Sequence, residues 1–394
     1  MGNAPNIKRK SIYVLTLVSI FLLLEISARF ILPDAKLSRL ESILRILEED
    51  AGLFWKVKPR LDTVFEGARV RTNSLGLRSD EILPKKDGTM RILCLGASPT
   101  FGWGVQVDQA YPALLEKRLA QRFPGRKIEV INAGQIGYTS YQGLILLERR
   151  LLKYSPDIIT VSYVLNDIDR YRFFRNDSLS DKELPPGNLL STCFNNILAN
   201  SRFMLVLRRA VFGVLSRDNK FAAGLLKKQF NVSQDRVEPR DYKSNLINIA
   251  NLCRHKGIKL VFIKMPVHIL LPQLNSEEMD VVRFGKWLSR HYYKLGCEKE
   301  SLGEYSQARL LFAKAKDFQI FEVNNRSSGY NKIMEDVAGS NALPLVDAVG
   351  IFSKQGMGDE LFNGPKDPIH PSALGHELIA SALFDTIAVS GSLE

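Results

Sequence analysis

The stretch RILCLGASPTFGWGV, residues 91–105, decides how the rest of the chain is interpreted. Its first part is typical of a short buried strand that ends at Gly96, and Ser98 follows on a tight loop. A phosphate-binding loop would carry a lysine where Trp103 stands, and the three glycines lack the G-x-G-x-x-G spacing of a dinucleotide-binding loop. Two interpretations remain, an ordinary turn and a serine nucleophile presented at the end of a strand.

Strand and helix patterns alternate on either side of this stretch. Apolar runs bounded by turn residues predict five buried strands, at 91–96, 127–134, 156–167, 258–266 and 343–350. Amphipathic patterns predict helices between and after them, at 111–123, 140–154, 242–257 and 371–387. This alternation predicts an α/β fold in which a parallel sheet carries helices on both faces.

Two long stretches, at about 171–240 and 275–335, interrupt the alternation and are predicted to be helical insertions. The first contains SRFMLVLRRAVFGVL (201–215), a basic amphipathic pattern that predicts a helical cap over the sheet edge, with membrane-surface contact as the alternative. The second contains GEYSQARLLFAKA (303–315), which resembles half of a tetratricopeptide repeat and follows a candidate first helix at 284–296. One repeat cannot form a solenoid, so a helical hairpin packed on the main domain is predicted.

The N-terminus carries a long apolar segment, Ser11 to Leu32, behind three consecutive basic residues, Lys8 to Lys10. At ~1.5 Å per residue the segment is about 33 Å long, roughly the thickness of a bilayer core. Residues 33–50 carry three basic and five acidic side chains, so the positive-inside rule places the N-terminus in the cytoplasm and the remainder outside. Glu25 and Arg29 are costly in lipid, but they lie one turn apart near the outer end, where pairing and snorkelling help.

A cleaved signal peptide is the alternative interpretation of this segment, because its most apolar part, Ile12 to Leu24, is short. The sequence Ile26-Ser27-Ala28 is a poor cleavage site, which favours an uncleaved single-pass anchor. The predicted division is a cytoplasmic tail (1–10), a transmembrane anchor (11–32), a juxtamembrane segment without strong periodicity (33–88) and a main domain (89–388) with the two insertions.

Charge and cysteine content narrow the classes of partner. The net charge of +12 suits anionic membranes or wall polymers. Nucleic acid is not predicted as a partner, because no basic run is interleaved with aromatic residues. The four cysteines show no metal-ligand spacing, so no metal and no cofactor is predicted. Cys94 falls inside a predicted strand, and pairing among the other three is left open.

Polar residues gather where the predicted strands end, which is where open α/β sheets form their sites. Gly134 follows the second strand, Asn166 and Asp167 follow the third, and Asp367 and His370 precede the closing helix. Each could be a turn or cap residue, but together they would require several coincidences at the right strand ends.

These residue types have a common chemical use. A serine hydroxyl becomes nucleophilic when a base accepts its proton, and His370 could do this if Asp367 holds its other nitrogen. The backbone N–H groups of Ser98 and Gly134 and the amide of Asn166 could then form an oxyanion hole. Gly134 lacks a Cβ and so allows close approach of backbone.

With these blocks in this order, the chain resembles the SGNH (GDSL-type) hydrolases over roughly residues 70–388, including TNSLGLRSDEI (72–82) ahead of the first strand. The resemblance implies a three-layer α/β/α sandwich with a flavodoxin-like strand order and metal-free ester hydrolysis. It implies Ser98, Asp367 and His370 as the catalytic triad. It also implies Ser98, Gly134 and Asn166 as the oxyanion hole.

The chain departs from the family pattern at two positions. Ala97 replaces the aspartate of the G-D-S block, which is expected to loosen the serine loop. Val164 replaces the glycine two residues before Asn166, which is expected to narrow the site. Neither change removes a catalytic group.

The leading functional prediction is a membrane-anchored extracytoplasmic serine esterase that removes acyl groups from an envelope glycan or lipid ester. One alternative is an acyltransferase that passes the same acyl-serine to a glycan hydroxyl. Another is a non-catalytic glycan-binding or assembly protein, which the change at Ala97 would favour. The retained Ser98, Asn166, Asp367 and His370 argue for the enzyme.

Overall fold

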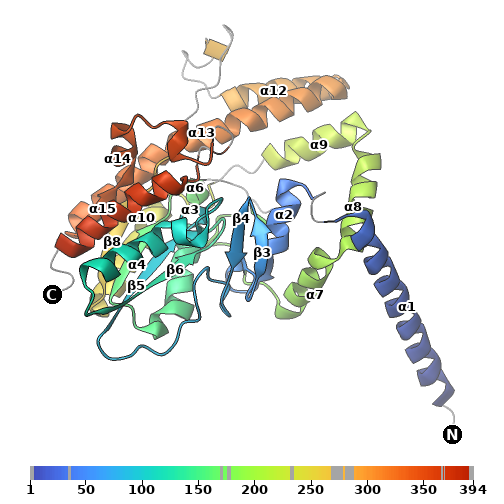
Figure 1. Cartoon of the computed structure of the whole chain (residues 1–394). Coiled ribbons are helices and arrows are strands. Elements are labelled where there is room, and N and C mark those ends of the chain that lie inside the picture. The colour runs from blue at the N-terminus through green and yellow to red at the C-terminus, as the bar shows by residue number, and fades with distance from the viewer. Residues whose placement is uncertain are drawn as a thin grey trace.

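The computed structural model describes residues 4–33, 37–168, 172–174, 179–230, 235–267, 278–279, 288–364, 367 and 369–389. Its centre is a sheet of five parallel strands, which confirms the α/β fold (Figure 1). The strands are β5 (Thr89–Gly96), β6 (Lys127–Gly134), β7 (Ile158–Ser162), β8 (Lys259–Lys264) and β9 (Leu345–Asp347). They lie in the order β6-β5-β7-β8-β9, the flavodoxin-like order in which the chain changes direction beside its first core strand.

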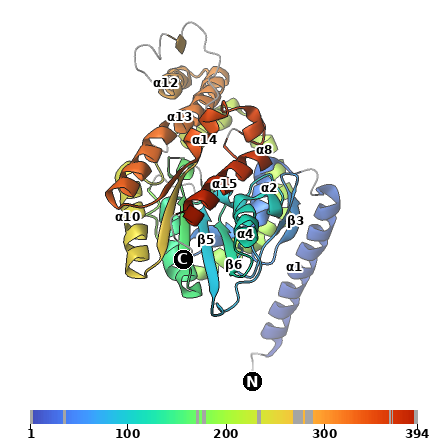
Figure 2. The ribbon, with the colours of Figure 1, turned by 60° about the vertical axis from the view of Figure 1, so that its left-hand side comes forward.

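Helices cover both faces of the sheet, so the core has three layers (Figure 2). Side chains of β5 alternate between the two, with Ile92 and Cys94 in one hydrophobic core and Leu93 and Leu95 in the other. The first core is closed by α4 (Tyr111–Arg122), α14 (Ala348–Lys354) and α15 (Ala373–Val389). The second is closed by α5 (Ser140–Leu146), α10 (Pro239–His255) and α13 (Tyr305–Ser340).

The register of the sheet aligns the strand ends that carry the predicted site. Gly96 at the end of β5 pairs with Gly134 on one side and with Ser162 on the other. The segments that follow β5, β6 and β7 therefore leave the sheet at the same edge. Ser98 follows β5, the middle strand of the three.

Residues 37–88 are more structured than their weak periodicity predicted. They form α2 (Arg39–Ile46) and two antiparallel hairpins, β1 (Leu47–Asp50) with β2 (Phe54–Val57) and β3 (Asp62–Phe65) with β4 (Ala68–Arg71). Strands of four residues are too short to show an alternating pattern in sequence. Long-range contacts hold them: Trp55 is fully buried, and its indole N–H donates to the Ile136 carbonyl at 2.8 Å.

The first insertion forms α7 (Leu189–Asn200), α8 (Arg202–Leu215) and α9 (Asn219–Phe230). The predicted cap over the sheet edge is wrong for α8, which packs beside α1 and α7 instead (Figure 1). Its first turn meets the N-terminal helix, where the Phe203 ring lies against Phe21, a partner more than 170 residues away that periodicity alone cannot identify. The helix α9 turns back toward the main domain, where Ala223 packs against Ala308 and Phe312 of α13.

The second insertion contains the predicted helical hairpin, made of α12 (Leu288–Ser301) and α13. Gly296 lets the two helices approach, because a Cβ there would lie 2.6 Å from the ring of Phe312. The helix α13 has 36 residues and also contacts α10 and β8. The likeness to a tetratricopeptide repeat is therefore limited to the α12–α13 hairpin. The first part of the candidate first helix, at 284–287, lies outside the described residues.

The N-terminal helix α1 (Ala4–Ile31) projects away from the domain (Figures 1 and 2). Its segment Ser11–Ile31, 21 residues long, is long and apolar enough to cross a membrane and is almost entirely exposed. A helix of this kind at an N-terminus is a membrane anchor or a signal sequence. The helix starts at Ala4, so most of the predicted tail 1–10 continues it.

Candidate active site

Ser98 begins a one-turn helix directly after the end of β5. The strand ends at Gly96, Ala97 is extended, and α3 (Ser98–Phe101) follows. This tight turn needs glycine at 96, because a Cβ there would lie 1.9 Å from Thr100 Oγ1. The Ser98 side chain is nearly covered, with 8% of the residue exposed.

His370 and Asp367 complete a hydrogen-bonded chain with Ser98. The Nε2 atom of His370 lies 2.8 Å from Ser98 Oγ, and its Nδ1 atom lies 2.7 Å from Asp367 Oδ1. All three residues are buried. His370 comes into contact with Ser98 although the two are 272 positions apart in the sequence. This is the arrangement in which a histidine removes the serine proton while a carboxylate fixes its tautomer.

Trp103 lies flat against the His370 ring, with ring centroids 4.7 Å apart and planes inclined by 8°. Phe65, from the β3–β4 hairpin, meets the Trp103 ring edge-on, with ring centroids 4.6 Å apart. The stacking restricts rotation of the imidazole. The sequence had drawn attention to Trp103 only as the residue that excludes a phosphate-binding loop.

The serine loop is held firmly even though Ala97 replaces the family's aspartate. Arg78, nearly fully buried, donates Nη1 to the Gly102 carbonyl at 2.6 Å and Nη2 to the Val105 carbonyl at 2.8 Å. Burial lowers the pKa of Arg78 to about 10, yet the guanidinium stays charged near neutral pH. The loosening expected from Ala97 is thus opposed by an arginine that sequence analysis passed over within TNSLGLRSDEI.

Val164 is buried in the structure, and the narrowing of the site expected from it stays a prediction. This side chain is 5% exposed and belongs to the hydrophobic core on one face of the sheet. It therefore fills the core and contributes to packing.

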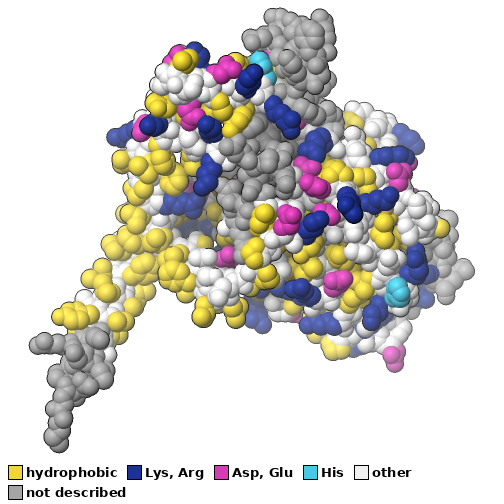
Figure 3. Space-filling model, turned by 180° about the vertical axis from the view of Figure 1, so that it is seen from behind, with side chains coloured by type: hydrophobic (Ala, Val, Ile, Leu, Met, Phe, Trp, Pro, Cys, Tyr) yellow, Lys and Arg dark blue, Asp and Glu magenta, His cyan; other side chains and the backbone are white. Residues whose placement is uncertain are grey.

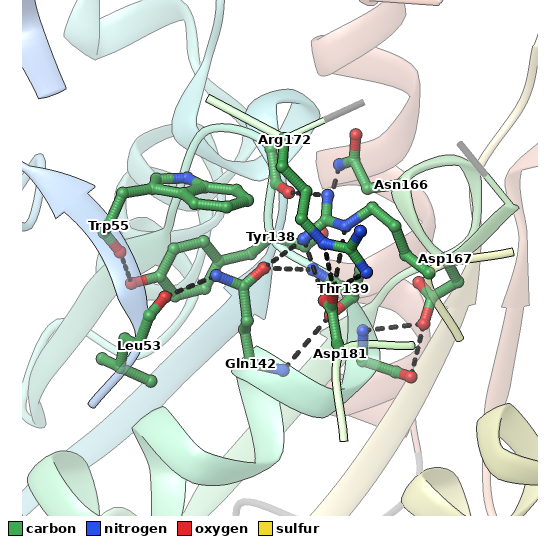
Figure 4. Close-up of polar contacts among 12 residues, drawn as sticks. Leu53, Trp55, Tyr138, Thr139, Gln142, Asn166, Asp167, Arg172 and Asp181 are labelled. Carbon is green, nitrogen blue, oxygen red and sulfur yellow. Dashed lines mark hydrogen bonds and ion pairs between the residues drawn. The ribbon is translucent and has the colours of Figure 1, made fainter. Parts of the chain in front are cut away.

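The three predicted oxyanion-hole donors differ in availability. Among the described residues, the Ser98 N–H meets no acceptor and is free for a substrate oxygen. The Asn166 amide donates one hydrogen to the Tyr138 carbonyl at 3.1 Å, which leaves its second hydrogen available (Figure 4). The Gly134 N–H is already used, because it donates to Asn132 Oδ1 at 3.0 Å.

Gly134 has a packing role that the structure makes explicit. A Cβ on it would lie 2.2 Å from the Phe101 nitrogen, so the backbone that approaches closely is that of α3. The loop after β6 offers another donor in Gly137, whose N–H meets no acceptor among the described residues. Gly137 has φ +75° and neighbours Tyr138, which anchors Asn166. The second glycine of NAGQIGYTS was the sequence signal for it.

A buried ionic cluster ties the first insertion to this loop (Figure 4). Asp181 accepts from Arg172 and Arg236 at 2.9 Å each and from Thr139 at 2.8 Å. Arg236 also donates to the Gly137 carbonyl at 2.7 Å. The insertion thus fixes the backbone of the loop that borders the site.

Asp167, next to Asn166 on α6 (Leu165–Ile168), is a fully buried carboxyl. Its Oδ1 atom accepts from the Ser140 N–H at 2.9 Å, whereas its Oδ2 atom has no partner among the described residues. Burial is the main cause that raises the pKa of Asp167, to about 7. The folded protein therefore keeps this proton over a pH range in which an unfolded chain, with a carboxyl pKa of about 4, releases it.

This difference predicts a pH-dependent effect of Asp167→Asn. Stability from a carboxyl with a raised folded-state pKa is complete below about pH 4 and falls until the pH passes about 7. The amide does not titrate, so the variant should gain stability relative to the parent by roughly 1 kcal/mol per pH unit between pH 4.5 and 7. Urea unfolding at four pH values measures this. The exposed Asp87→Asn is the control, and a constant difference for Asp167→Asn would contradict the expectation.

The described part of the chain holds no group of three or more His, Cys, Asp or Glu side chains arranged to bind a metal ion. All four cysteines are free thiols. Burial raises the pKa of Cys94 to about 12, so this thiol is chemically inert within β5.

One comparison with known proteins identifies a family. A model described as the GDSL-like lipase/acylhydrolase family matches residues 94–378. LAE5, an alpha/beta hydrolase from the metagenome of Lake Arreo, is 16% identical with a TM-score of 0.41, over 77% of this chain and 96% of that one. A lipase/acylhydrolase from Enterococcus faecalis is 16% identical with a TM-score of 0.40, over 76% and 96%. Axe2, an acetylxylan esterase from Geobacillus stearothermophilus, is 14% identical with a TM-score of 0.41, over 77% and 96%. No curated protein matches the chain significantly.

Proposed function

The chain belongs to the GDSL-like lipase/acylhydrolase family of carboxylic ester hydrolases, and from this premise we propose that Ser98 is its nucleophile and that α1 anchors it outside the cytoplasm. The proposed substrate is an acyl group on a glycan or lipid of the cell envelope. The observation that carries the proposal is the hydrogen-bonded chain from Ser98 Oγ through His370 to Asp367, with distances of 2.8 and 2.7 Å.

In the proposed reaction each group has its own step. Ser98 Oγ attacks the acyl carbon while its proton passes to His370 Nε2, and Asp367 stabilises the imidazolium through Nδ1–H. The Ser98 N–H and the free hydrogen of Asn166 stabilise the negative oxygen of the tetrahedral intermediate. Its collapse releases the alcohol, which takes the proton from His370. Water then attacks the acyl-serine by the same route and releases the acid.

Orientation and charge support an envelope substrate. Three basic residues precede the apolar segment of α1, which favours a cytoplasmic N-terminus. The catalytic domain then faces the outside, where acylated glycans and lipids are the abundant esters. The net charge of +12 favours residence near anionic envelope polymers or lipids.

Two measurements on the purified full chain test the enzymatic part. A fluorophosphonate should label the parent and not Ser98→Ala, and nitrophenyl esters of increasing length together with acetylated glycans should define the acyl group. Product analysis with a glycan acceptor distinguishes hydrolysis from transfer, because a transferase would yield the acylated acceptor. Absence of labelling in the folded parent would reject Ser98 as the nucleophile.

Asn166→Ala is expected to lower kcat by about 10²- to 10³-fold, the usual effect of removing one oxyanion donor. The reason is the position of its amide, held by the Tyr138 carbonyl with one hydrogen still free. Steady-state kinetics on the best ester measures the change, and Asn166→Asp, which removes the donor while preserving size, should match it. A change confined to KM would make Asn166 a substrate-binding residue.

The topology has its own test. Protease added to intact spheroplasts should digest the catalytic domain, while the untreated full-length chain should stay in the membrane fraction after a carbonate wash. A protected domain would reverse the orientation and place the substrate in the cytoplasm. A mature N-terminus near Arg29 would show a cleaved signal and remove the anchor, leaving the extracytoplasmic location intact.

A further inference from the structure

The helix α7 turns its polar side chains toward the protein and its apolar side chains outward. Asn196 accepts from the Glu49 N–H at 2.7 Å and donates to the Glu49 carbonyl at 3.0 Å, and Asn195 donates to the Glu49 carboxylate at 2.9 Å. The opposite face exposes apolar residues at helical spacing, namely Leu190, Cys193, Phe194 and Ile197. A helix on a water-facing surface has the reverse polarity.

The exposed apolar surface continues along α8 and onto α1. Near the C-terminal end of α8, four apolar side chains are each at least 40% exposed, namely Val211, Phe212, Val214 and Leu215. In Figure 3 hydrophobic side chains run along the part of α1 that is not grey and extend onto the elements beside its C-terminal end. A continuous apolar surface of this kind marks a contact with lipid or with another protein.

The junction between α7 and α8 is hydrogen-bonded to Glu25 of α1, which lies before the end of the apolar segment at Leu32. The Glu25 carboxylate accepts from the backbone N–H groups of Arg202 and Phe203, at 3.0 Å each, and from the Ser201 hydroxyl at 2.8 Å. The Phe203 ring meets Phe21 edge-on, with centroids 6.1 Å apart. These hydrogen bonds give an acceptor to backbone N–H groups at the start of α8. They also give donors to Glu25, the one acidic residue in the apolar segment.

Helix geometry fixes how deep this junction lies. Glu25 precedes Leu32, the end of the apolar segment, by about 10 Å along the helix. The part before Glu25, Ser11 to Leu24, is only about 21 Å long, whereas the hydrocarbon core of a bilayer is about 30 Å thick. A membrane spanned by α1 must therefore extend beyond Glu25 and surround the start of α8.

We propose that the α7–α8 corner, residues 189–215, is embedded in the outer leaflet of the membrane that α1 spans. The proposal rests on the proposed anchoring by α1. Lipid is the occupant that fits, because the exposed face of α7 is continuous with α1 and lies at a depth that hydrocarbon must already occupy. An amphipathic helix in this position buries its apolar face about 5–10 Å into the interface. The corner would hold the catalytic domain in one orientation against the bilayer.

The chain offers a natural reporter in Cys193. It is exposed on the outward face of α7, whereas Cys94 and Cys253 are buried, so replacing the half-buried Cys297 by Ala leaves one reactive thiol. An NBD fluorophore on Cys193 of the full chain, reconstituted in phosphatidylcholine/phosphatidylglycerol nanodiscs, should be quenched at least threefold more by doxyl-labelled lipids than NBD on Gln121→Cys in a Cys193→Ser background. Gln121 is exposed on α4, and α4 lies on the opposite side of the domain from α1 (Figure 1).

A substitution pair tests whether apolar contact is the cause. Phe194→Asp with Ile197→Asp should reduce quenching at Cys193 by at least half, because charged side chains are costly in hydrocarbon. Leu302→Asp with Leu310→Asp should leave it unchanged, since both leucines are 69% exposed on the α12–α13 hairpin, which lies away from α7 (Figure 1).

A label on Val18→Cys in α1 separates failure of this inference from failure of the anchor. Quenching at position 18 without quenching at 193 overturns the inference and leaves the anchor intact. Quenching at neither position rejects both. Energy transfer between labelled copies, together with loss of quenching at 193, would show that a second chain covers the corner and would also overturn the inference.

Discussion

Ser98→Ala and His370→Ala are each expected to lower kcat for ester hydrolysis by about 10⁶-fold, a near-complete loss. The two atoms that exchange the proton, Ser98 Oγ and His370 Nε2, are 2.8 Å apart, so removing either one removes the attacking group or its base. Esterase assays on the purified full chain measure the loss. Circular dichroism and thermal unfolding should show that both variants remain folded, because alanine fits either site without a clash.

The double variant should be scarcely less active than either single one, because a nucleophile and its base act as a unit. His255→Ala, on the exposed end of α10, serves as the matched control and should keep full activity. Full activity in folded Ser98→Ala would refute the assignment of the nucleophile. Additive losses would indicate that His370 acts in a separate step.

Asp367→Asn is expected to lower kcat by about 10⁴-fold while KM changes little. The Asp367 carboxylate accepts from His370 Nδ1 at 2.7 Å and so leaves Nε2 free to accept the serine proton. An amide in this place can donate to Nδ1 and stabilise the wrong tautomer. Pre-steady-state acylation with a fluorophosphonate should slow in parallel, since it depends on the same proton transfer.

Asp359→Asn is the control for this experiment, because Asp359 is an exposed carboxylate a few residues earlier in the chain. It should leave kcat unchanged. An Asp367→Asn variant with more than a tenth of the parent kcat would mean that stacking on Trp103 alone orients His370 and that Asp367 only stabilises the segment before α15.

The five core strands and their direction could be predicted from the sequence. Each is a short apolar run bounded by turn residues, and a helix separates it from the next, which leaves a parallel sheet as the arrangement that buries both faces. The position of Ser98 beside Gly134 and Asn166 could be predicted for the same reason, because parallel strands bring the segments after them to one edge. Asp367 and His370 follow β9 only after α14, and their approach to Ser98 was expected from the chemistry that a serine, a histidine and a carboxylate share. The resemblance to a family then added the strand order.

The hairpins β1–β4 could not be predicted, because strands of four residues carry too little periodicity. Their stability comes from partners far along the chain, such as the Ile136 carbonyl that accepts from Trp55. The support of the serine loop by Arg78 could not be predicted from the sequence either. A buried arginine whose partners are backbone carbonyls leaves no complementary acidic residue in the sequence to reveal it.

The sequence by itself determined which residue types stand at the strand ends, whereas the tertiary structure decided which of their hydrogen-bonding groups are free. Gly134 is required for its missing Cβ, but Asn132 occupies its N–H, while the Ser98 N–H stays open. The orientation of α7 was likewise decided by a distant contact. Its asparagines face Glu49, 147 residues away in the case of Asn196, and so turn the apolar side outward. The amphipathic pattern of a helix gives its two faces, and only the groups packed against it determine which face is exposed.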